Sequence, residues 1–334
     1  MITTIAEIGQ AHDGSLGMLH AYIDALAETG VTAVKFQTHI ARAESSEFEP
    51  FRVKFSSQDA SRYDYWQRME FSREQWVAIG QHCREKGLRF ISSPFSNLAV
   101  DVLEEAGVDE YKIGSGEVTN HLLLQKLAAT GKPVILSSGM SSWEELDAAV
   151  NLFRSQGTSL SILQCTTAYP TAAEQYGLNV IKQLAERYEL PVGFSDHSGG
   201  IAAGIAAAAL GAKILEFHVV FDKQMFGPDV TSSLTMDEVK TLVSAVNQVD
   251  IALNNPVDKS DTEPYTGLKQ IFEKSLAVNK SLDSGHVLTF EDLEAKKPAG
   301  RGIAASEFDQ IIGRTLKRPL GQWDFINEND LEDS

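Results

Sequence analysis

Short apolar segments alternate with amphipathic segments from residue 2 to about residue 253 of the chain. The apolar segments have the length of buried strands, and the segments between them carry apolar residues at helical spacing. Several of these helical segments end in glycine, a common helix stop signal. Eight strands are predicted in this way, at 2–9, 31–38, 88–95, 110–115, 132–140, 159–167, 191–198 and 213–221.

A strand–helix unit that repeats eight times predicts an α/β fold, a parallel sheet closed into a (β/α)8 TIM barrel. An open, doubly wound sheet is the alternative. Against the open sheet, no GxGxxG motif follows the first strand, and the units are nearly even in length. We therefore expect the closed barrel.

Two segments depart from the repeat. Residues 39–71 form a long polar and aromatic insertion after the second strand, and connections of this length are usually lids or binding loops. Residues 254–267 are rich in Pro, Asp, Asn and Thr, which is typical of a linker. We predict a barrel domain at 1–253, a linker at 254–267 and a small domain at 268–334, whose limited core implies that it docks onto another surface.

Composition narrows the classes of partner and compartment. The 334 residues carry a formal net charge of −17, which argues against binding to nucleic acid or to an anionic membrane. No apolar run has the length of a membrane span, and the first residues lack the layout of a signal peptide. The two cysteines, Cys83 and Cys165, are expected in the core, which fits a reducing cytoplasm.

Polar side chains occur at the carboxyl end of every predicted strand, where barrel enzymes place their chemistry. A barrel that needed only stability would not carry such groups on all eight strands, so the pattern predicts an active site. In chain order these residues are Glu7, Lys35, Gln37, Ser92, Ser93, Lys112, Ser115, Glu117, Ser137, Ser138, Thr166, Thr167, Tyr169, Ser195, Asp196, His197, Glu216 and His218.

Two histidines and two lysines stand out among these residues. His197 and His218 fall at the same depth on neighbouring strands, a pattern that favours a divalent first-row metal over two isolated structural histidines. Lys35 and Lys112 lie within apolar strands, and a buried ammonium needs an anionic partner. That partner is either a carboxylate of the chain, Glu7 or Glu117, or a bound phosphate or carboxylate held with help from nearby serines.

Nine motifs together resemble sialic acid synthases, which condense phosphoenolpyruvate with a hexosamine-type aldose to make nonulosonic acids. The motifs are AEIGQAHDG (6–14), VKFQTH (34–39), FISSPFS (90–96), YKIGSGE (111–117), ILSSGM (135–140), LQCTTAYPT (163–171), GFSDHS (193–198), LEFHVVFD (215–222) and GPDVTSSL (227–234). The tail resembles the antifreeze-like SAF domain, a β-clip fold that reaches across a dimer in this family. The resemblance therefore implies a domain-swapped homodimer.

The resemblance also assigns roles to residues. It implies Mn2+ or Mg2+ at His197 and His218, and catalytic roles for Glu7, Glu117 and the two histidines. It implies sugar contacts from Glu117, Tyr169 and Asp229. The phosphoenolpyruvate-binding residues that it implies are Lys35, Gln37, Ser93, Lys112, Ser115, Ser137, Thr167 and Ser195.

Three positions depart from the family pattern. Thr167 stands where some members have Asn, and Ala11 replaces a frequent Asn. Lys297 replaces an Arg that meets the N-acetyl group of the sugar, and the two side chains are not interchangeable at a planar contact. Either Arg301 takes over this contact or the sugar differs. The insertion is closer to the legionaminic-type branch of the family than to the sialic one.

The expected reaction joins phosphoenolpyruvate to an open-chain N-acetylated hexosamine, either N-acetylmannosamine or its 2,4-diacetamido-6-deoxy analogue. The products are a nine-carbon 2-keto acid and phosphate, released by C–O cleavage. A rival within the same class is a related synthase for a phosphorylated sugar, bound by Arg52, Lys54, Arg62 and Arg68 of the insertion. Two rivals of a different class are a metal-dependent hydrolase, which usually needs three or four ligands, and a non-catalytic carbohydrate-binding protein.

Overall fold

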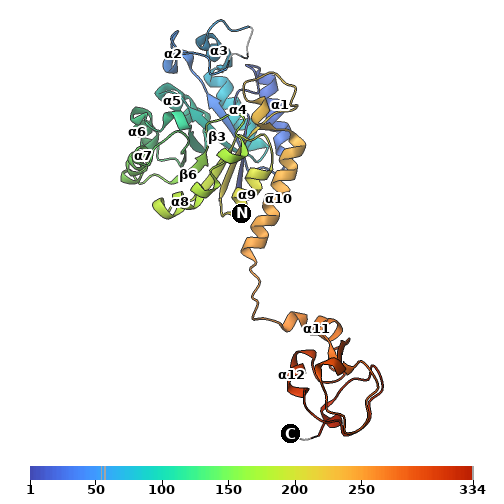
Figure 1. Cartoon of the computed structure of the whole chain (residues 1–334). Coiled ribbons are helices and arrows are strands. Elements are labelled where there is room, and N and C mark those ends of the chain that lie inside the picture. Colours follow the sequence, from blue (N-terminus) through green and yellow to red (C-terminus); the bar gives the residue numbers. More distant parts are fainter. Residues whose placement is uncertain (54, 56–57, 333–334) are drawn as a thin grey trace. The chain divides into compact units, whose positions relative to one another are not determined.

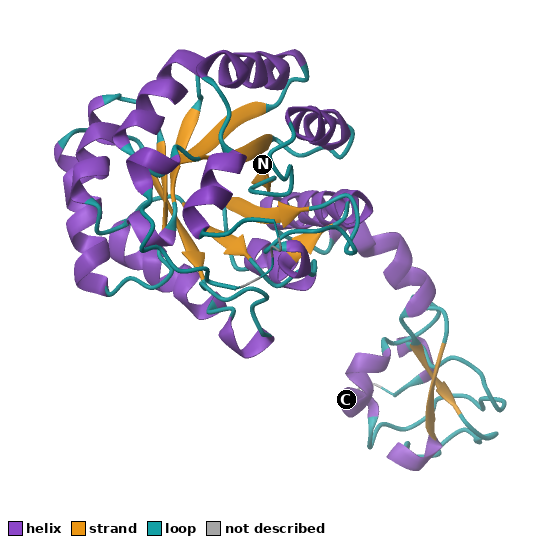
Figure 2. Cartoon of the chain, turned by 90° about the horizontal axis from the view of Figure 1, so that it is seen from above, coloured by secondary structure: helices purple, strands orange, loops and turns teal. Residues whose placement is uncertain are grey.

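The computed structural model describes residues 1–53, 55 and 58–332, and the chain divides into two compact units, residues 1–255 and 256–334. In the first unit, eight parallel strands pair in chain order and β1 also pairs with β8, which closes the sheet into a barrel. The (β/α)8 TIM barrel is thus confirmed (Figures 1 and 2). The strands are β1 (Thr3–Glu7), β2 (Ala33–Thr38), β3 (Arg89–Pro94), β4 (Glu110–Ile113), β5 (Val134–Ser137), β6 (Leu160–Cys165), β7 (Val192–Asp196) and β8 (Ile214–Val219).

Helices surround the strands, as the view from above shows (Figure 2). Four of them, α3, α4, α7 and α10, begin with a capping box in which a Ser or Thr and a residue three positions later satisfy each other's backbone N–H groups. The helices of this unit are α1 (Leu16–Ala27), α2 (Ala41–Glu44), α3 (Arg62–Met69), α4 (Arg73–Glu85), α5 (Asn97–Ala106), α6 (His121–Ala129), α7 (Trp143–Ser155), α8 (Leu178–Tyr188), α9 (Ala202–Ala209) and α10 (Met236–Asn254).

The inside of the barrel is built in layers. Six apolar side chains form a small buried cluster, Ile5, Ala33, Ile91, Ile135, Leu163 and Ile214. Because side chains of a strand alternate between its two faces, the residue two positions later points to the same side. Those residues are Glu7, Lys35, Ser93, Ser137, Cys165 and Glu216, all of them buried. An apolar layer therefore lies beneath a polar layer at the carboxyl ends of the strands.

The insertion after β2 has a small core of its own. It contains α2 and α3, which contact each other, and the buried residues Ala41, Tyr65, Trp66 and Met69 form a cluster there. A two-residue strand, β9 (Ser233–Leu234), pairs with β8 and was not predicted. It extends the sheet next to the loop that carries Asp229.

The second unit contains α11 (Thr266–Phe272), α12 (Phe308–Ile311) and the antiparallel pair β10 (Ser275–Val278) and β11 (Leu293–Lys296). Several isolated β-bridges and a separate buried cluster that includes Leu276, Val278 and Leu316 hold it together. The predicted linker, 254–267, falls between the end of α10 and the first residues of α11. Among the described helices, none has the length and apolar character needed to cross a membrane.

Candidate active site

A cavity of about 350 Å3 opens at the carboxyl ends of the barrel strands. Glu7 lies next to its wall, in contact with Lys35. The sequence-predicted residues that line the cavity come from seven strands and their following loops: Lys35, Gln37, Ser93, Lys112, Ser115, Glu117, Ser137, Thr167, Tyr169, Ser195, His197, His218 and Asp229. The structure therefore brings together every barrel residue for which a catalytic or binding role is predicted.

Four buried charges form the centre of this site. Lys35 pairs with Glu7, and its Nζ lies 3.7 Å from Oε1 of Glu216. Lys112 Nζ lies 3.2 Å from the same Glu216 oxygen, which also accepts a hydrogen bond of 3.1 Å from Ser195 Oγ. Two ammonium groups thus face two carboxylates, and the charges of the cluster balance. This balance matters because an uncompensated charge at such a depth is strongly destabilising.

Two residues of the cluster, Glu216 and Lys35, have shifted pKa values. Burial alone would raise the pKa of Glu216, but Lys112 and Lys35 lower it to about 2. Burial alone would lower the pKa of Lys35, but Glu216 and Glu7 raise it. Both directions favour the charged forms of Glu216 and Lys35 near neutral pH.

The counter-ions differ in part from those expected. Glu7 does pair with Lys35, but Glu117 is not a partner of either lysine, since its carboxylate accepts a hydrogen bond from Asn120 Nδ2 at 2.7 Å. Lys112 pairs instead with Glu216, a strand-end residue to which the sequence assigns no role. The sequence does contain a signal for this pairing. Glu216 lies two residues after Ile214, and this spacing places its carboxylate in the polar layer.

Several hydroxyl groups surround the lysines. Lys35 Nζ donates to Ser93 Oγ at 3.5 Å. Within the described part of the chain, the buried Ser137 Oγ has no hydrogen-bond partner. A Cβ atom at Gly139 would lie 2.6 Å from both Ser115 Oγ and Thr167 Oγ1, so glycine at this position leaves room for these two hydroxyl groups. An unpaired buried hydroxyl in the wall of the cavity suits an oxyanion ligand.

His197 and His218 converge as predicted, with 5.3 Å between their ring centroids. Nδ1 of His197 lies 3.0 Å from the backbone oxygen of Thr166. A carbonyl oxygen only accepts, so Nδ1 carries the hydrogen and Nε2 keeps its lone pair when the ring is neutral. Asp196 does not orient this ring, because its carboxylate accepts from the backbone N and the hydroxyl of Ser198.

Both histidines are buried, and their surroundings affect them differently. Burial lowers the pKa of His218. Burial would also lower the pKa of His197, but contacts with the Cys165 thiol and the Thr166 carbonyl raise it. Among the described residues, no group of three or more His, Cys, Asp or Glu side chains has a geometry suited to a metal ion. His197 and His218 offer two imidazole nitrogens in the cavity, and an ion held by these two ligands would keep positions open for water and substrate.

Three loops meet above the cavity. The Arg52 guanidinium stacks over the Tyr169 ring at 4.1 Å and pairs with Asp229 at 2.6 Å. Arg62 stacks on Trp66 at 4.1 Å and lies 3.5 Å from Glu49. Both arginines thus already have carboxylate partners.

The remaining predicted residues lie elsewhere. Arg68 pairs with Asp13 and Asp59 and does not line the cavity, and Lys54 lies outside the described residues. Lys297 and Arg301 belong to the second unit. There, Lys297 Nζ lies 4.8 Å from the centroid of the Phe272 ring, and the Arg301 backbone N donates to Ser275 Oγ. Cavity-lining residues that were not predicted include Gln10, His39, Glu44 and Cys165.

The chain forms a closed parallel barrel, and paired charges and converging histidines lie at the carboxyl ends of its strands. This combination is typical of a barrel enzyme for an anionic substrate. Comparison with known proteins agrees. A model of the NeuB family matches residues 22–258, and one of the SAF domain matches residues 273–332. The chain belongs to the NeuB family and ends in a SAF domain. This confirms the expected enzyme class, sialic acid synthases, and the expected C-terminal domain.

Relatives of nearly the same length carry different synthase activities. The chain is 32% identical to the N,N'-diacetyllegionaminic acid synthase of Campylobacter jejuni, over 97% of this chain and 98% of that protein. It is 31% identical to the human N-acetylneuraminate-9-phosphate synthase, over 97% and 91% of the two chains. The crystal structure of the N-acetylneuraminic acid synthetase from Leptospira borgpetersenii, 28% identical, matches with a TM-score of 0.70 over 79% of this chain and 90% of that one.

The charge cluster generates a prediction for Glu216→Gln. Because the folded-state pKa of Glu216 lies below its ordinary value of 4.5, its stabilising effect is complete above that pH and is lost as the pH falls toward about 2. At pH 7 the variant should lose about 3 kcal/mol in the free energy of unfolding, and the gap to the wild type should narrow below about pH 4. Urea denaturation at several pH values measures this.

The matched control is Glu186→Gln, since Glu186 is exposed and pairs only with Lys182 on the same helix among the described residues. Its effect should stay below about 0.5 kcal/mol at every pH. A Glu216→Gln variant as stable as the wild type, or one whose deficit does not change with pH, would contradict the assigned pairing.

Proposed function

We propose that this protein condenses phosphoenolpyruvate with an open-chain N-acetylated hexosamine to give a nine-carbon 2-keto acid and phosphate. The observation that carries the proposal is the buried lysine pair, Lys35 and Lys112, at the carboxyl end of the barrel, with His197 and His218 in the same cavity. An anion site and a metal-ligand pair in one pocket match a reaction between an anionic enol ester and an aldehyde.

Phosphoenolpyruvate is assigned to the lysine side of the cavity. Each ammonium has three donors, and within the described part of the chain Lys112 shows one polar contact, with Glu216, so donors remain for a phosphate or carboxylate. The unpaired hydroxyl of Ser137 supports the same assignment. The proposed binding residues are Lys35, Gln37, Ser93, Lys112, Ser115, Ser137, Thr167 and Ser195. Held at both ends, the enol can present C3 to the aldehyde.

His197 and His218 would hold Mn2+ or Mg2+. When bound, such an ion supplies Lewis acidity that polarises a carbonyl group and balances developing negative charge. The contact between His197 Nδ1 and the Thr166 carbonyl fixes the ring so that Nε2 is available as a ligand.

Two carboxylates are assigned to charge balance and proton transfer. Glu7 lies against Lys35 beside the proposed phosphoenolpyruvate site, where it can balance cationic character at C2 after C3 has attacked the aldehyde. Burial raises the pKa of Glu117, which suits it to hold and deliver a proton to the sugar oxygen. Water then adds to C2, and phosphate leaves with the bridging oxygen.

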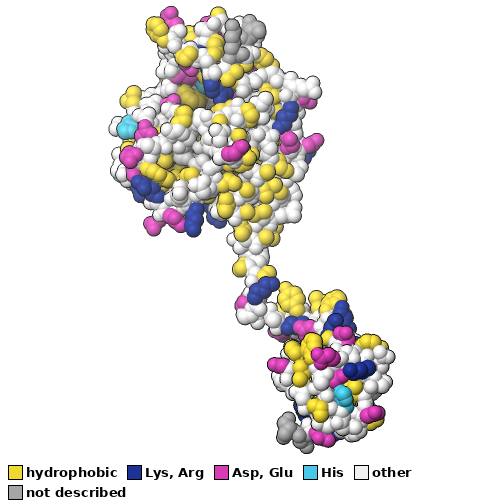
Figure 3. All heavy atoms as spheres, in the orientation of Figure 1, with side chains coloured by type: hydrophobic (Ala, Val, Ile, Leu, Met, Phe, Trp, Pro, Cys, Tyr) yellow, Lys and Arg dark blue, Asp and Glu magenta, His cyan; other side chains and the backbone are white. Residues whose placement is uncertain are grey.

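The sugar is assigned to the rim of the cavity. Glu117, Tyr169 and Asp229 line it there. Lys297 and Arg301 are proposed to complete the site from a second copy of the chain, in a domain-swapped homodimer. Leu268, Ile271 and Phe272 of α11 support this proposal, because they are exposed on the second unit by 51%, 59% and 60%. Figure 3 shows apolar side chains on this unit near α11.

We place the enzyme in the cytoplasm.

We favour a sugar without a phosphate group. Binding of a sugar phosphate at the mouth would need free cations, whereas Arg52 pairs with Asp229 and Arg62 lies beside Glu49. The relatives include a synthase whose product is a 9-phosphate, so a phosphorylated sugar remains the alternative to test. Family membership disfavours the hydrolase and the non-catalytic carbohydrate-binding protein.

Phosphate release from phosphoenolpyruvate with Mn2+ and a panel of aldoses tests the function. We expect kcat/KM for 2,4-diacetamido-2,4,6-trideoxymannose to exceed that for N-acetylmannosamine by about tenfold. A site that binds the second acetamido group of the first sugar would disfavour the second sugar, which lacks that group. N-acetylmannosamine 6-phosphate should be the poorest substrate of the three.

The control reaction omits the sugar and should release no phosphate. A strong preference for N-acetylmannosamine would contradict the legionaminic-type assignment. A preference for its 6-phosphate would favour the synthase that acts on a phosphorylated sugar. No release with any sugar would refute the proposed reaction.

The metal assignment predicts that His197→Ala and His218→Ala lose Mn2+ binding, measured by calorimetry, and that metal-dependent turnover falls on the order of 100-fold or more. His121→Ala, at the exposed start of α6, should match the wild type in both measurements. Substantial activity of His197→Ala in a metal-free preparation would contradict the assignment.

A further inference from the structure

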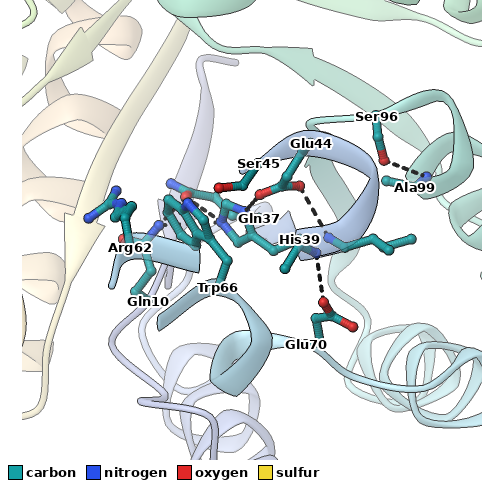
Figure 4. Close-up of polar contacts among 12 residues, drawn as sticks. Gln10, Gln37, His39, Glu44, Ser45, Arg62, Trp66, Glu70, Ser96 and Ala99 are labelled. Carbon is teal, nitrogen blue, oxygen red and sulfur yellow. Dashed lines mark hydrogen bonds and ion pairs between the residues drawn. The ribbon is translucent and has the colours of Figure 1, made fainter. Parts of the chain in front are cut away.

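His39 follows β2 directly and lies between two aromatic rings. The Trp66 ring of the insertion stacks on it at 3.8 Å with an interplanar angle of 19°, and the Phe95 ring stacks on the other side at 4.6 Å and 7°. The side chain is 3% exposed. The imidazole is therefore held in one plane, with one wall supplied by the insertion (Figure 4).

Both ring nitrogens of His39 have oxygen partners. Nδ1 lies 2.6 Å from Oε1 of Glu44, and Nε2 lies 3.3 Å from Oε1 of Gln37. The other Glu44 oxygen accepts from the backbone N of Ile40 at 3.1 Å, so α2 holds this carboxylate in place. Because a carboxylate and an amide oxygen only accept, the ring donates to both of them when it is the imidazolium partner of the Glu44 carboxylate.

Gln37 links His39 to the charge cluster. Its Nε2 donates to Glu7 Oε1 at 3.1 Å, and the other oxygen of Glu7 pairs with Lys35. Its Oε1 faces His39 and also accepts from Gln10. If the Gln37 side-chain amide were reversed, its oxygen would lie against the Glu7 carboxylate, and the two oxygens would repel each other. The donor on His39 therefore favours the one amide orientation that supports Glu7.

These contacts form a continuous chain, Glu44–His39–Gln37–Glu7–Lys35. From it we infer that His39 is a positioning residue for the reaction: it orients Gln37, and Gln37 orients Glu7 at the reacting centre. The inference rests on the proposed function. It gives the insertion a role in the chemical step, since Glu44 and Trp66 fix His39.

The variant His39→Phe keeps a ring between Trp66 and Phe95 but removes both donors. Glu7 is assigned to balance the cationic character at C2, which develops only in the transition state. The variant should therefore lower kcat about tenfold and change the KM for phosphoenolpyruvate and the KM for the sugar by less than about threefold each. His39→Gln retains a donor that can reach Gln37 and should recover most of kcat. His39→Asn retains a donor only toward Glu44 and should behave like His39→Phe.

A double-mutant cycle with Gln37→Met separates positioning from packing. If His39 acts through Gln37, the double variant should have the kcat of Gln37→Met alone. His121→Phe is the matched control on the surface and should leave kcat unchanged. Melting temperatures of all variants are measured in parallel. If His39→Phe folds poorly, His39→Asn replaces it in the cycle. The double variant with Gln37→Met should then again have the kcat of Gln37→Met alone.

Three results would overturn the inference: a His39→Phe variant with kcat within twofold of the wild type, equal losses in His39→Gln and His39→Phe, or independent effects of the His39 and Gln37 changes. Each requires an active wild-type enzyme. A wild type that releases no phosphate from phosphoenolpyruvate with any sugar would instead refute the proposed function.

Discussion

Two ammonium groups buried at one end of a barrel need compensating charge, and the structure of the site follows from this requirement. Lys35 and Lys112 each reach a carboxylate, and Glu216 Oε1 lies within 4 Å of both. The cluster is neutral as a whole, which makes its burial tolerable, yet its lysines keep donors that a ligand can use. A site arranged in this way can accept anions although the chain carries a net charge of −17.

Strand geometry delivers these charges to one place. In each of six strands an apolar residue of the inner layer is followed two positions later by a polar or thiol-bearing side chain on the same face. The insertion closes the cavity from above through Arg52 and Arg62 and reaches the cluster through His39. The insertion thus forms part of the wall of the cavity and is connected by hydrogen bonds to the buried charge cluster.

The sequence predicted features that depend on local periodicity. All eight strands were found, and the residues at their carboxyl ends do line one cavity, because closure of a parallel barrel brings those ends together. Specific pairings were harder to predict. Glu117 is not the lysine partner that the sequence allowed, and Glu216 is one, because the choice between carboxylates depends on side-chain reach across the barrel. His39 and Glu44 were missed because their environment depends on how α2 and α3 fold over β2, which no period in the sequence reveals.

In the proposed reaction the lysine cluster holds phosphoenolpyruvate while C3 attacks the aldehyde, and phosphate then departs with the bridging oxygen after water has added to C2. Phosphoenolpyruvate labelled with 18O at the bridge tests this most directly, with the released phosphate and the keto acid analysed by mass spectrometry. Our account predicts that the label appears in the phosphate. Label retained in the organic product would mean that the P–O bond breaks and would contradict the account.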